Sequence, residues 1–443
     1  MGSTERLAEF IVNLTFKNIP KEVIDQAKKC FLDWLGVTLG GANYPIANIL
    51  TEFAGDIGGR EQATILGKGI RTNILNAALA NGAISHVLDF DDTHTGSLCH
   101  VSSPIMPVIF SLGEYKHING MDCIAAFVSA FETSARIGMA MGPDHYHAGW
   151  HATSTLGRLG ATAAAGKLLG LNQEEMRHAL GIGATQAGGF QIVFGTMCKP
   201  FHPGKAAMDG ILAAMLAKKG IDSHKDILEA KKGFCEMFSK DVDFIKVTEG
   251  LGEEYQILNN TFKPYASCLL THPSIDAALD LKNTYNISIQ DIKKVEGHVA
   301  PLVMNVAGKK NPKAALEGKF SIYYCIAVAL AEGEVGEDKF TDQRMHDEML
   351  SNLQKLISIE VDTNFDNTTA ELTIKTRKGS SYTQKVLAPR GDPRNPLSFS
   401  QLEQKFKILA GMVLSEEKIE RLITHFQRLE KLEDMSRLIP LCS

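Results

Sequence analysis

Residues 151–171 read HATSTLGRLGATAAAGKLLGL and give the strongest indication of how this chain folds. Small side chains recur along the segment at Gly157, Gly160 and Ala163, and two further alanines follow directly. Because glycine and alanine allow helices to approach closely, the pattern predicts a central helix that is packed by neighbours on several sides. The surrounding sequence is therefore expected to supply the helices that enclose it.

The flanking sequence, from residue 4 to about residue 240, follows a helical pattern. Pro20 suits the first turn of a helix, and apolar residues at three- and four-residue spacing follow it until the pair Gly40-Gly41. A second helical pattern, rich in alanine and asparagine, runs from Thr72 toward His86. This part of the chain is predicted to be helix after helix.

Later in the chain, apolar and polar residues begin to alternate. LISIEVD and AELTIKT have the two-residue period of strands, and Gly379 follows AELTIKT as a hairpin turn. The Pro/Gly-rich segment GDPRNPLS then precedes a return of the helical pattern. The predicted fold class is mainly α with an α+β second domain. Residues 1–268 and 397–443 form a large all-helical domain, and residues 269–396 form a smaller, inserted α+β lid domain.

Composition and charge restrict the classes of protein to which the chain can belong. Its 443 residues are 44% hydrophobic and 22% charged, with a net charge of −5, which is typical of a globular protein. Lys and Arg form no dense block interleaved with aromatics, so neither a nucleic acid nor an anionic membrane is expected as a partner. The eight cysteines are scattered without a CxxC pair, which indicates a reducing compartment and no disulfide framework.

The sequence shows no targeting or membrane-spanning signal. The opening MGSTERLAEF has no apolar signal core, and Glu5 and Glu9 disfavour a transit peptide. No uncharged apolar run approaches the roughly 18 residues that a membrane helix needs. A cytoplasmic location is the expectation.

An acidic stretch, VLDFDDTHT at residues 87–95, resembles the nucleophile motif of a Mg²⁺-dependent phosphohydrolase. That chemistry requires the aspartates to follow a buried parallel strand, so that carboxylates and metal converge on phosphate. The preceding NAALANGAISH has a helical composition instead, and the later acidic pair is missing, since Asp392 begins DPRNP. The aspartate-rich helix of prenyl-diphosphate enzymes fits less well, because Thr95 replaces its last aspartate. Both metal-dependent interpretations are disfavoured.

Histidines provide two further hypotheses. His145, His147 and His151 could form a metal site, although the zinc-helix pattern HExxH is absent. The alternative is a pair of histidines that serve as acid and base near neutral pH and need no metal.

Two lysine-proline segments are candidates for binding an anion. CKPFHPGKAAMDG contains Lys199 and His202 just ahead of a helix that is expected to begin near Lys205. FKPYASCLLTHPS contains Lys263 and His272 and also precedes a helix. A lysine and a histidine ahead of a helix suit an anionic substrate, and their repetition favours a functional role for both segments.

A glycine-rich segment, GIGATQAGGF at residues 181–190, resembles a dinucleotide-binding loop. It follows a helical pattern where such a loop follows a strand, and Gln186 occupies the third glycine position. Close helix packing is the prediction for this segment.

These segments, in this order, resemble the MmgE/PrpD family, which includes 2-methylcitrate dehydratase and cis-aconitate decarboxylase. The resemblance spans roughly residues 4 to 435. It implies a helical domain built from both ends of the chain, an α+β lid, a homodimer, and lyase chemistry on a small polycarboxylate without metal or organic cofactor. The matching segments are LDFDDT with a following histidine, GWHATSTLGRLGATAAAGKLLGL, KPFHPGKAA, FKPYASCLLTHPSIDAA, KFSIYYCIAVAL and GDPRNPLS.

The resemblance also implies roles for individual residues. Two histidines share the acid and base roles, an aspartate orients a histidine, two lysines bind carboxylates, and a threonine and a tyrosine hydrogen-bond the substrate. Departures from the family pattern, at Val101 and at Tyr323 where proline is common, leave the exact substrate open. In this sequence the implied residues are His100 and His151; Asp89; Lys199 and Lys263; and Thr93 and Tyr324, with His202 and His272 added as substrate-binding candidates.

The resemblance makes dehydration of a compound such as 2-methylcitrate the first expectation. Decarboxylation of cis-aconitate, or epimerisation or isomerisation of a related dicarboxylate, is the alternative. A Mg²⁺-dependent phosphohydrolase and a non-catalytic helical scaffold are the remaining hypotheses.

Overall fold

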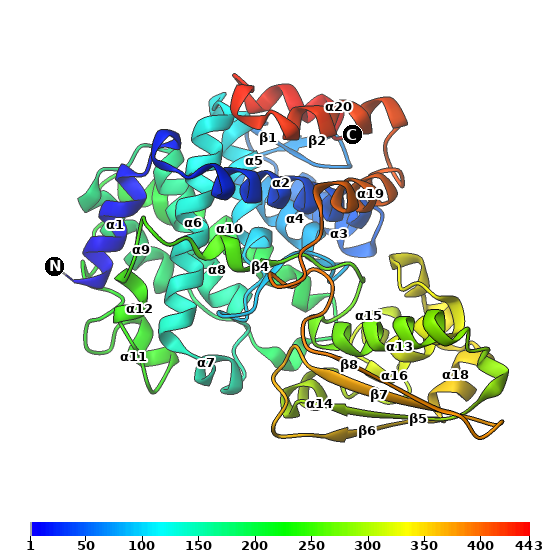
Figure 1. The fold of residues 1–443 in the computed structure, drawn as a ribbon. Helices are drawn as coiled ribbons and strands as arrows, with labels where there is room; N and C mark the ends of the chain where they lie inside the picture. Colours follow the sequence, from blue (N-terminus) through cyan, green and yellow to red (C-terminus); the bar gives the residue numbers. More distant parts are fainter. Residues whose placement is uncertain (1) are drawn as a thin grey trace. The chain divides into compact units, whose positions relative to one another are not determined.

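The computed structural model describes residues 2–443, which divide into two compact units (Figure 1). Unit 1 comprises the described residues up to Val87, together with Asp91–Thr261 and Ser398–Ser443, and it is mainly helical. Unit 2 comprises Leu88–Phe90 and Phe262–Leu397 and combines helices with a sheet. The predicted fold class is confirmed. The division begins seven residues before the expected position 268/269, and it also assigns three residues of the acidic stretch to unit 2.

Helix α8 (Ala152–Leu168) is the predicted crowded helix of unit 1, and its residues 152–166 are all buried. It packs against α5, α6, α9 and α10. A Cβ atom at Gly157 would contact Pro104 of α5, which explains why small residues are needed here. The longer helices of unit 1 are α1 (Ser3–Asn13), α2 (Lys21–Gly41), α3 (Pro45–Ile57), α4 (Ile74–His86), α5 (Ser102–Lys116), α6 (Gly120–Met141), α8, α9 (Gln173–Ala184), α10 (Cys198–Lys218), α19 (Phe399–Ala410) and α20 (Glu416–Gln427).

Several sequence predictions for unit 1 are confirmed. Helix α2 begins directly after Pro20 and ends at Gly41. The dinucleotide-like segment begins inside α9, where a Cβ atom at Gly183 would contact Thr162 of α8, so this glycine serves close helix packing.

Helix α10 differs from its prediction, because it begins at Cys198 and not near Lys205. The segment that contains Lys199 is therefore helical, and Pro203 lies inside the helix. Proline lacks an N–H group, and the first turn of a helix leaves its N–H groups without intrahelical partners, so a proline at position 200 is compatible with an early helix start.

Unit 1 also contains two short strand pairs that the sequence did not predict. Strands β1 (Ala63–Ile65) and β2 (Ile70–Thr72) form an antiparallel hairpin. Strand β3 (Thr93–His94) pairs with β4 (Asn260–Thr261), which fixes the acidic stretch to a segment far along the chain. Short helices in unit 1 are α7 (Asp144–His147), α11 (Phe234–Phe238) and α12 (Ile245–Thr248).

Unit 2 contains a four-stranded sheet with the order β6-β5-β7-β8. Strands β5 and β6 are parallel, and the other neighbours are antiparallel. The predicted hairpin is confirmed, and Gly379 in its turn has φ +90°, which favours glycine. Helix α13 packs against β7, β8 and α16. The strands are β5 (Ile292–Val299), β6 (Ile357–Val361), β7 (Ala370–Thr376) and β8 (Ser381–Val386), and the helices are α13 (His272–Tyr285), α14 (Pro301–Ala307), α15 (Ala315–Gly318), α16 (Ile322–Glu332), α17 (Asp342–Met345) and α18 (Glu348–Gln354).

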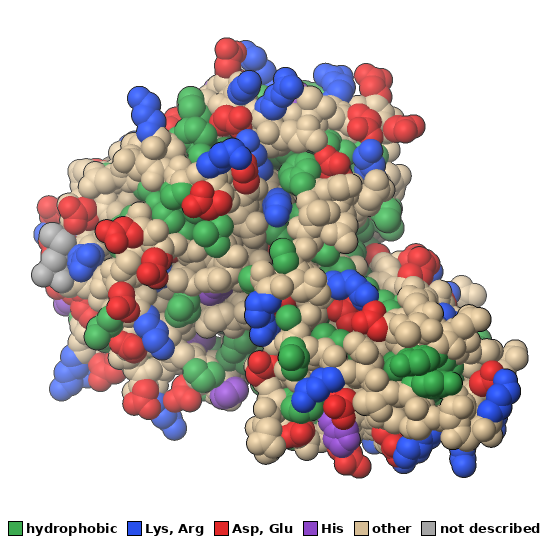
Figure 2. Space-filling model, in the orientation of Figure 1, with side chains coloured by type: hydrophobic (Ala, Val, Ile, Leu, Met, Phe, Trp, Pro, Cys, Tyr) green, Lys and Arg blue, Asp and Glu red, His purple; other side chains and the backbone are tan. Residues whose placement is uncertain are grey.

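Within residues 2–443, no helix has both the length and the apolar character that crossing a membrane requires. On the face of the molecule drawn in Figure 2, acidic and basic side chains are interspersed, and neither sign forms a continuous area. This distribution gives a polyanionic partner no extended basic surface on that face.

Candidate functional site

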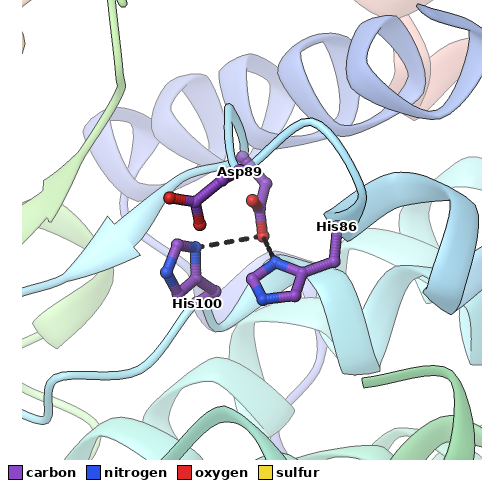
Figure 3. A group of neighbouring side chains, drawn as sticks. His86, Asp89 and His100 are labelled. Carbon is purple, nitrogen blue, oxygen red and sulfur yellow. Dashed lines mark hydrogen bonds and ion pairs between the residues drawn. The ribbon is translucent and has the colours of Figure 1, made fainter. Parts of the chain in front are cut away.

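The loop between α4 and α5 in unit 1 brings two histidines onto one carboxylate. The Nδ1 atoms of His86 and His100 lie 2.8 and 3.1 Å from Oδ2 of Asp91. In Figure 3, dashed lines run from these two histidine rings to one shared carboxylate. His86 and Asp91 have fully buried side chains, whereas the His100 side chain is 13% exposed. His100 is therefore the ring of this pair that solvent or a substrate can reach.

Neighbouring elements fix this loop in place. Helix α4 ends at His86, and the first residues of α5 face the aspartates. The Ser103 hydroxyl donates to Oδ2 of Asp91 at 2.5 Å. On the other side, the backbone N–H of His100 donates to Oγ1 of Thr153 in α8 at 3.1 Å. Asp91 is thus tied to α5, and His100 is tied to α8.

Thr93 lies in β3 beside this pair. Its Oγ1 is 3.4 Å from Nδ1 of His100, so it is a weak second contact of the same ring nitrogen. The pairing of β3 with β4 through Thr261 holds the threonine in position.

A second pair of histidines lies in the same unit. Nδ1 of His151, at the start of α8, is 2.9 Å from Nδ1 of His202 in α10, so one ring donates and the other accepts. The His151 ring stacks on His86 with 5.7 Å between ring centroids, which connects the two pairs. Phe194 contacts His151 edge to face at 4.9 Å.

Lys199 supplies positive charge to this group. Its Nζ lies 5.4 Å from the Phe194 ring centroid, and its side chain is almost fully buried. Lys199 is the second residue of α10, where the helix dipole opposes a cation, so its position is not explained by helix stability. A lysine at a helix N-terminus is well suited to bind an anion.

Electrostatics keep most of these imidazoles neutral. Burial lowers the pKa of His86 to about 3, and burial together with Lys199 and the other histidines lowers the pKa of His151 well below its usual range. Burial and the charges of Arg158 and Lys199 lower the pKa of His202 to about 4. Burial alone would raise the pKa of Asp91, but the charges and hydrogen bonds of His100 and His86 bring it well below its ordinary value. Asp91 is therefore ionised.

Unit 2 contains a different set of the expected residues. Asp89 adopts φ +50°, in the left-handed region, and Lys263 donates to its backbone carbonyl at 2.8 Å. The Lys263 side chain is fully buried, and its Nζ lies 3.5 Å from Oδ1 of Asp89. Lys319, which the sequence analysis did not select, donates to the Leu88 carbonyl and to Glu337, each at 2.5 Å. Two buried lysines thus hold the backbone on which Asp89 lies.

Tyr324 and His272 are also buried in unit 2. The Tyr324 hydroxyl donates to the Lys339 carbonyl at 2.6 Å, and burial raises its pKa to about 12. Nε2 of His272 is 3.2 Å from the Ser267 carbonyl. Both side chains have partners within unit 2.

Three donor atoms could hold a metal ion in unit 1. One atom each from His86, Asp91 and His100 lies within 4.8 Å of the others, and N and O donors of this kind suit zinc or another transition metal. The alternative metal site at His145, His147 and His151 is not supported within residues 2–443. His145 has contacts with Phe238 and Thr155 instead.

The phosphohydrolase hypothesis lacks its structural requirement. The element before the acidic stretch is α4, which a turn at Val87 and Leu88 follows, and residues 2–88 contain no parallel strand. The carboxylates therefore do not lie at the end of a parallel strand, where that chemistry needs them.

Sequence reasoning missed His86 and Asp91. The role of Asp89 in orienting a histidine stays a prediction, and within unit 1 Asp91 is the carboxylate that contacts both His86 and His100. The available signal was weak: a histidine as the last residue of a predicted helix, five residues before an aspartate. Whether His86 and Asp91 come into contact depends on the backbone turn between them.

Comparisons with known proteins give consistent results along the chain. The model of the MmgE/PrpD N-terminal domain matches residues 5–245, and that of the MmgE/PrpD C-terminal domain matches residues 265–431. A cis-aconitate decarboxylase of Aspergillus terreus is 28% identical over 469 residues, covering 99% of this chain and 96% of that protein. The cis-aconitate decarboxylases of Mus musculus and Homo sapiens are each 28% identical, covering 98% and 99% of this chain and 92% and 94% of those proteins.

Proposed function

Because the chain belongs to the MmgE/PrpD family, we propose that it is a lyase that acts on a small di- or tricarboxylate, and that it decarboxylates cis-aconitate. The names of the relatives favour this reaction over the dehydration of 2-methylcitrate that the sequence resemblance placed first. The similarity to the Aspergillus terreus protein extends over nearly the whole length of that protein and of this chain, which also favours decarboxylation.

The observation that carries the proposal is the grouping of imidazoles with one lysine in unit 1. Lys199 acts electrostatically on His86, His151 and His202. Breaking a C–C bond to release CO₂ leaves an electron pair that is delocalised toward the remaining carboxylates. A cation at a helix N-terminus stabilises that charge. An imidazole then delivers the proton that forms the new C–H bond.

His100 and His151 are the proposed acid and base residues, without assignment of which does which. The proposal keeps the expected roles of Asp89 and Tyr324 in catalysis. It also keeps the substrate-binding roles of the other expected residues. These are Thr93, Lys199, Lys263, His202 and His272.

The proposal is tested by following substrates by proton NMR. Purified protein is incubated separately with cis-aconitate, 2-methylcitrate, citrate and an imino-dicarboxylate, with and without EDTA. The expected result is loss of one carboxyl group from cis-aconitate, at a rate that EDTA does not change. Water elimination or epimerisation would assign the chain to an alternative reaction of the family. No turnover of any compound would reject the proposed lyase activity.

We propose in addition that the chain forms a homodimer, as the family resemblance implies. Light scattering after size-exclusion chromatography measures the molar mass directly, and the 48.3 kDa chain is expected at twice that value. A mass of one chain at micromolar concentration would contradict this.

A further inference from the structure

One oxygen of Asp91 lies within hydrogen-bonding distance of three donor groups. Nδ1 of His86 lies 2.8 Å from Oδ2, Nδ1 of His100 lies 3.1 Å away, and Oγ of Ser103 lies 2.5 Å away. An ionised carboxylate only accepts hydrogen bonds, so each of these three groups must donate. Both imidazoles therefore carry a proton on Nδ1.

A proton on Nδ1 defines the chemistry at the other ring nitrogen. A neutral imidazole with Nδ1–H has its lone pair on Nε2, which is the atom that can take up a proton. His100 is the partly exposed ring, so its Nε2 is the basic atom that this arrangement presents. A buried carboxylate that fixes a histidine in this way also stabilises the imidazolium formed during proton transfer.

His86 is arranged to hold the carboxylate and not to transfer protons itself. Its side chain is fully buried, and its Nε2 has no hydrogen-bond partner within residues 2–443. The His86 ring contacts the His100 ring edge to face, with 4.6 Å between the ring centroids, and this contact restricts rotation of the His100 ring.

We propose that Asp91 and His86 are positioning residues for His100. Asp91 selects the Nδ1–H tautomer of His100 and so directs Nε2 toward the reacting proton, and His86 locks the Asp91 carboxylate in the orientation that does this. The inference rests on the proposed lyase function for its kinetic consequences, whereas the tautomer that it predicts is a property of the protein alone.

The tautomers are measured first, without substrate. Long-range ¹H–¹⁵N spectra of histidine-labelled protein, after dialysis against EDTA, distinguish Nδ1–H from Nε2–H rings. The expected wild-type spectrum shows His86 and His100 as Nδ1–H tautomers. In Asp91→Asn, the His100 signal is expected to shift to a mixture that contains Nε2–H. A wild-type His100 with Nε2–H, or an unchanged His100 signal in Asp91→Asn, would overturn the proposal.

Kinetics give the second measurement. Asp91→Asn is expected to lower kcat by about 10²- to 10⁴-fold with KM changed less than about threefold, since the carboxylate acts through His100 and does not touch substrate. His86→Phe keeps the ring but removes the donor, and we expect a smaller loss of kcat with partial Nε2–H character at His100. Wild-type kcat in Asp91→Asn contradicts the proposal.

Asp92 provides a matched control in the same loop. Its carboxylate is equally buried, but it accepts from Ser102 and from Asn260 and contacts no histidine through a hydrogen bond within residues 2–443. Asp92→Asn should leave both histidine tautomers unchanged. If it altered them as Asp91→Asn does, the effect would come from the loop as a whole and the proposal would fail. If wild-type protein converts no substrate, the lyase function fails while the spectra still decide the tautomer.

Discussion

His100 is held from two sides, by Asp91 at its ring and by Thr153 at its backbone. Replacing it with alanine removes the proposed acid–base group but leaves His86 and Ser103 on the Asp91 carboxylate. We expect kcat to fall by about 10²- to 10⁴-fold, which is the usual contribution of a positioned acid or base. The melting temperature should stay within a few degrees of wild type, as differential scanning fluorimetry can measure.

His147→Ala is the matched control for this prediction, because His147 is exposed on the short helix α7. Its kcat should equal that of wild type. An active His100→Ala protein would remove His100 from the catalytic group.

Lys319 is the second residue whose replacement has a defined consequence. Its ammonium is fully buried against Glu337 and the Leu88 carbonyl in unit 2. Lys319→Met removes the cation from a buried pair, and loss of one partner typically costs about 3–5 kcal/mol. Urea denaturation should show this loss in the free energy of unfolding. The double variant Lys319→Met/Glu337→Gln should recover part of it.

Lys378→Met is the corresponding control in unit 2, since its ion pair with Asp291 is exposed. Exposed pairs contribute about 0–1 kcal/mol, so a similar loss in both lysine variants would show that burial is not the cause.

The sequence could identify the acidic stretch but could not rank its aspartates. Asp89, Asp91 and Asp92 lie within four residues, and Asp89 takes a left-handed backbone conformation that no sequence pattern indicates. After that turn, Asp91 contacts His86 and His100, while Lys263 contacts Asp89. Spacing alone does not contain this information.

At the scale of elements, close approach between α4 and α10 is a structural requirement. A Cβ atom at Gly204 would contact the Leu79 carbonyl and lie 2.8 Å from the backbone nitrogen of Ala83. Because the obstruction is backbone, Gly204→Ala must separate the helices, and overpacking of this kind costs about 1–3 kcal/mol. Urea denaturation followed by circular dichroism measures the loss.

Gly55→Ala in α3 is the control, because nothing lies within 4 Å of a Cβ atom there. The added methyl group should stabilise the protein by about 0.5–1 kcal/mol through helix propensity. If Gly55→Ala destabilised the protein as Gly204→Ala does, the loss at Gly204 could not be attributed to the close approach of α4 and α10.

Helices and strands were predictable where local chemistry decides them. Helix α2 begins after Pro20, and the β7–β8 hairpin turns at Gly379, as the sequence indicated. The start of α10 was wrong because a lysine-proline segment is typical of a turn, yet tertiary packing against α4 and α8 makes it helical. The pairing of β3 with β4 joins residues more than 160 positions apart, which no local pattern encodes.

At the scale of the whole molecule, the two units differ in how acid affects them. Burial lowers the pKa of six histidines in unit 1: His86, His94, His145, His151, His202 and His425. They are neutral when folded, but in the unfolded chain they bind protons below about pH 6.5. Unfolding therefore takes up protons, and this contribution to stability is full above about pH 6.5 and is lost as the pH falls toward 4.

Two buried carboxyl groups of unit 1 act in the opposite direction, whereas the lowered pKa of Asp91 adds to the loss of stability in acid. Burial raises the pKa of Asp92 to about 7 and also raises the pKa of Glu132 in unit 1. Each binds its proton more readily when folded, so acidification to about pH 4 stabilises the folded state through these two groups. The six histidines outnumber these two carboxyl groups, and unit 1 is expected to lose stability overall in acid.

In unit 2, burial raises the pKa of Asp276, so its titration favours the folded state as the pH decreases. We therefore expect acid to open unit 1 before unit 2. Hydrogen exchange at pH 7.5 and pH 5, corrected for intrinsic exchange rates, should show α4 and α8 losing protection while α13 and α16 keep it. His94→Gln removes one titrating group whose pKa is about 4, and it should reduce the loss in unit 1. Equal or earlier loss of protection in α13 and α16 would show that the buried histidines do not determine the acid stability of this chain.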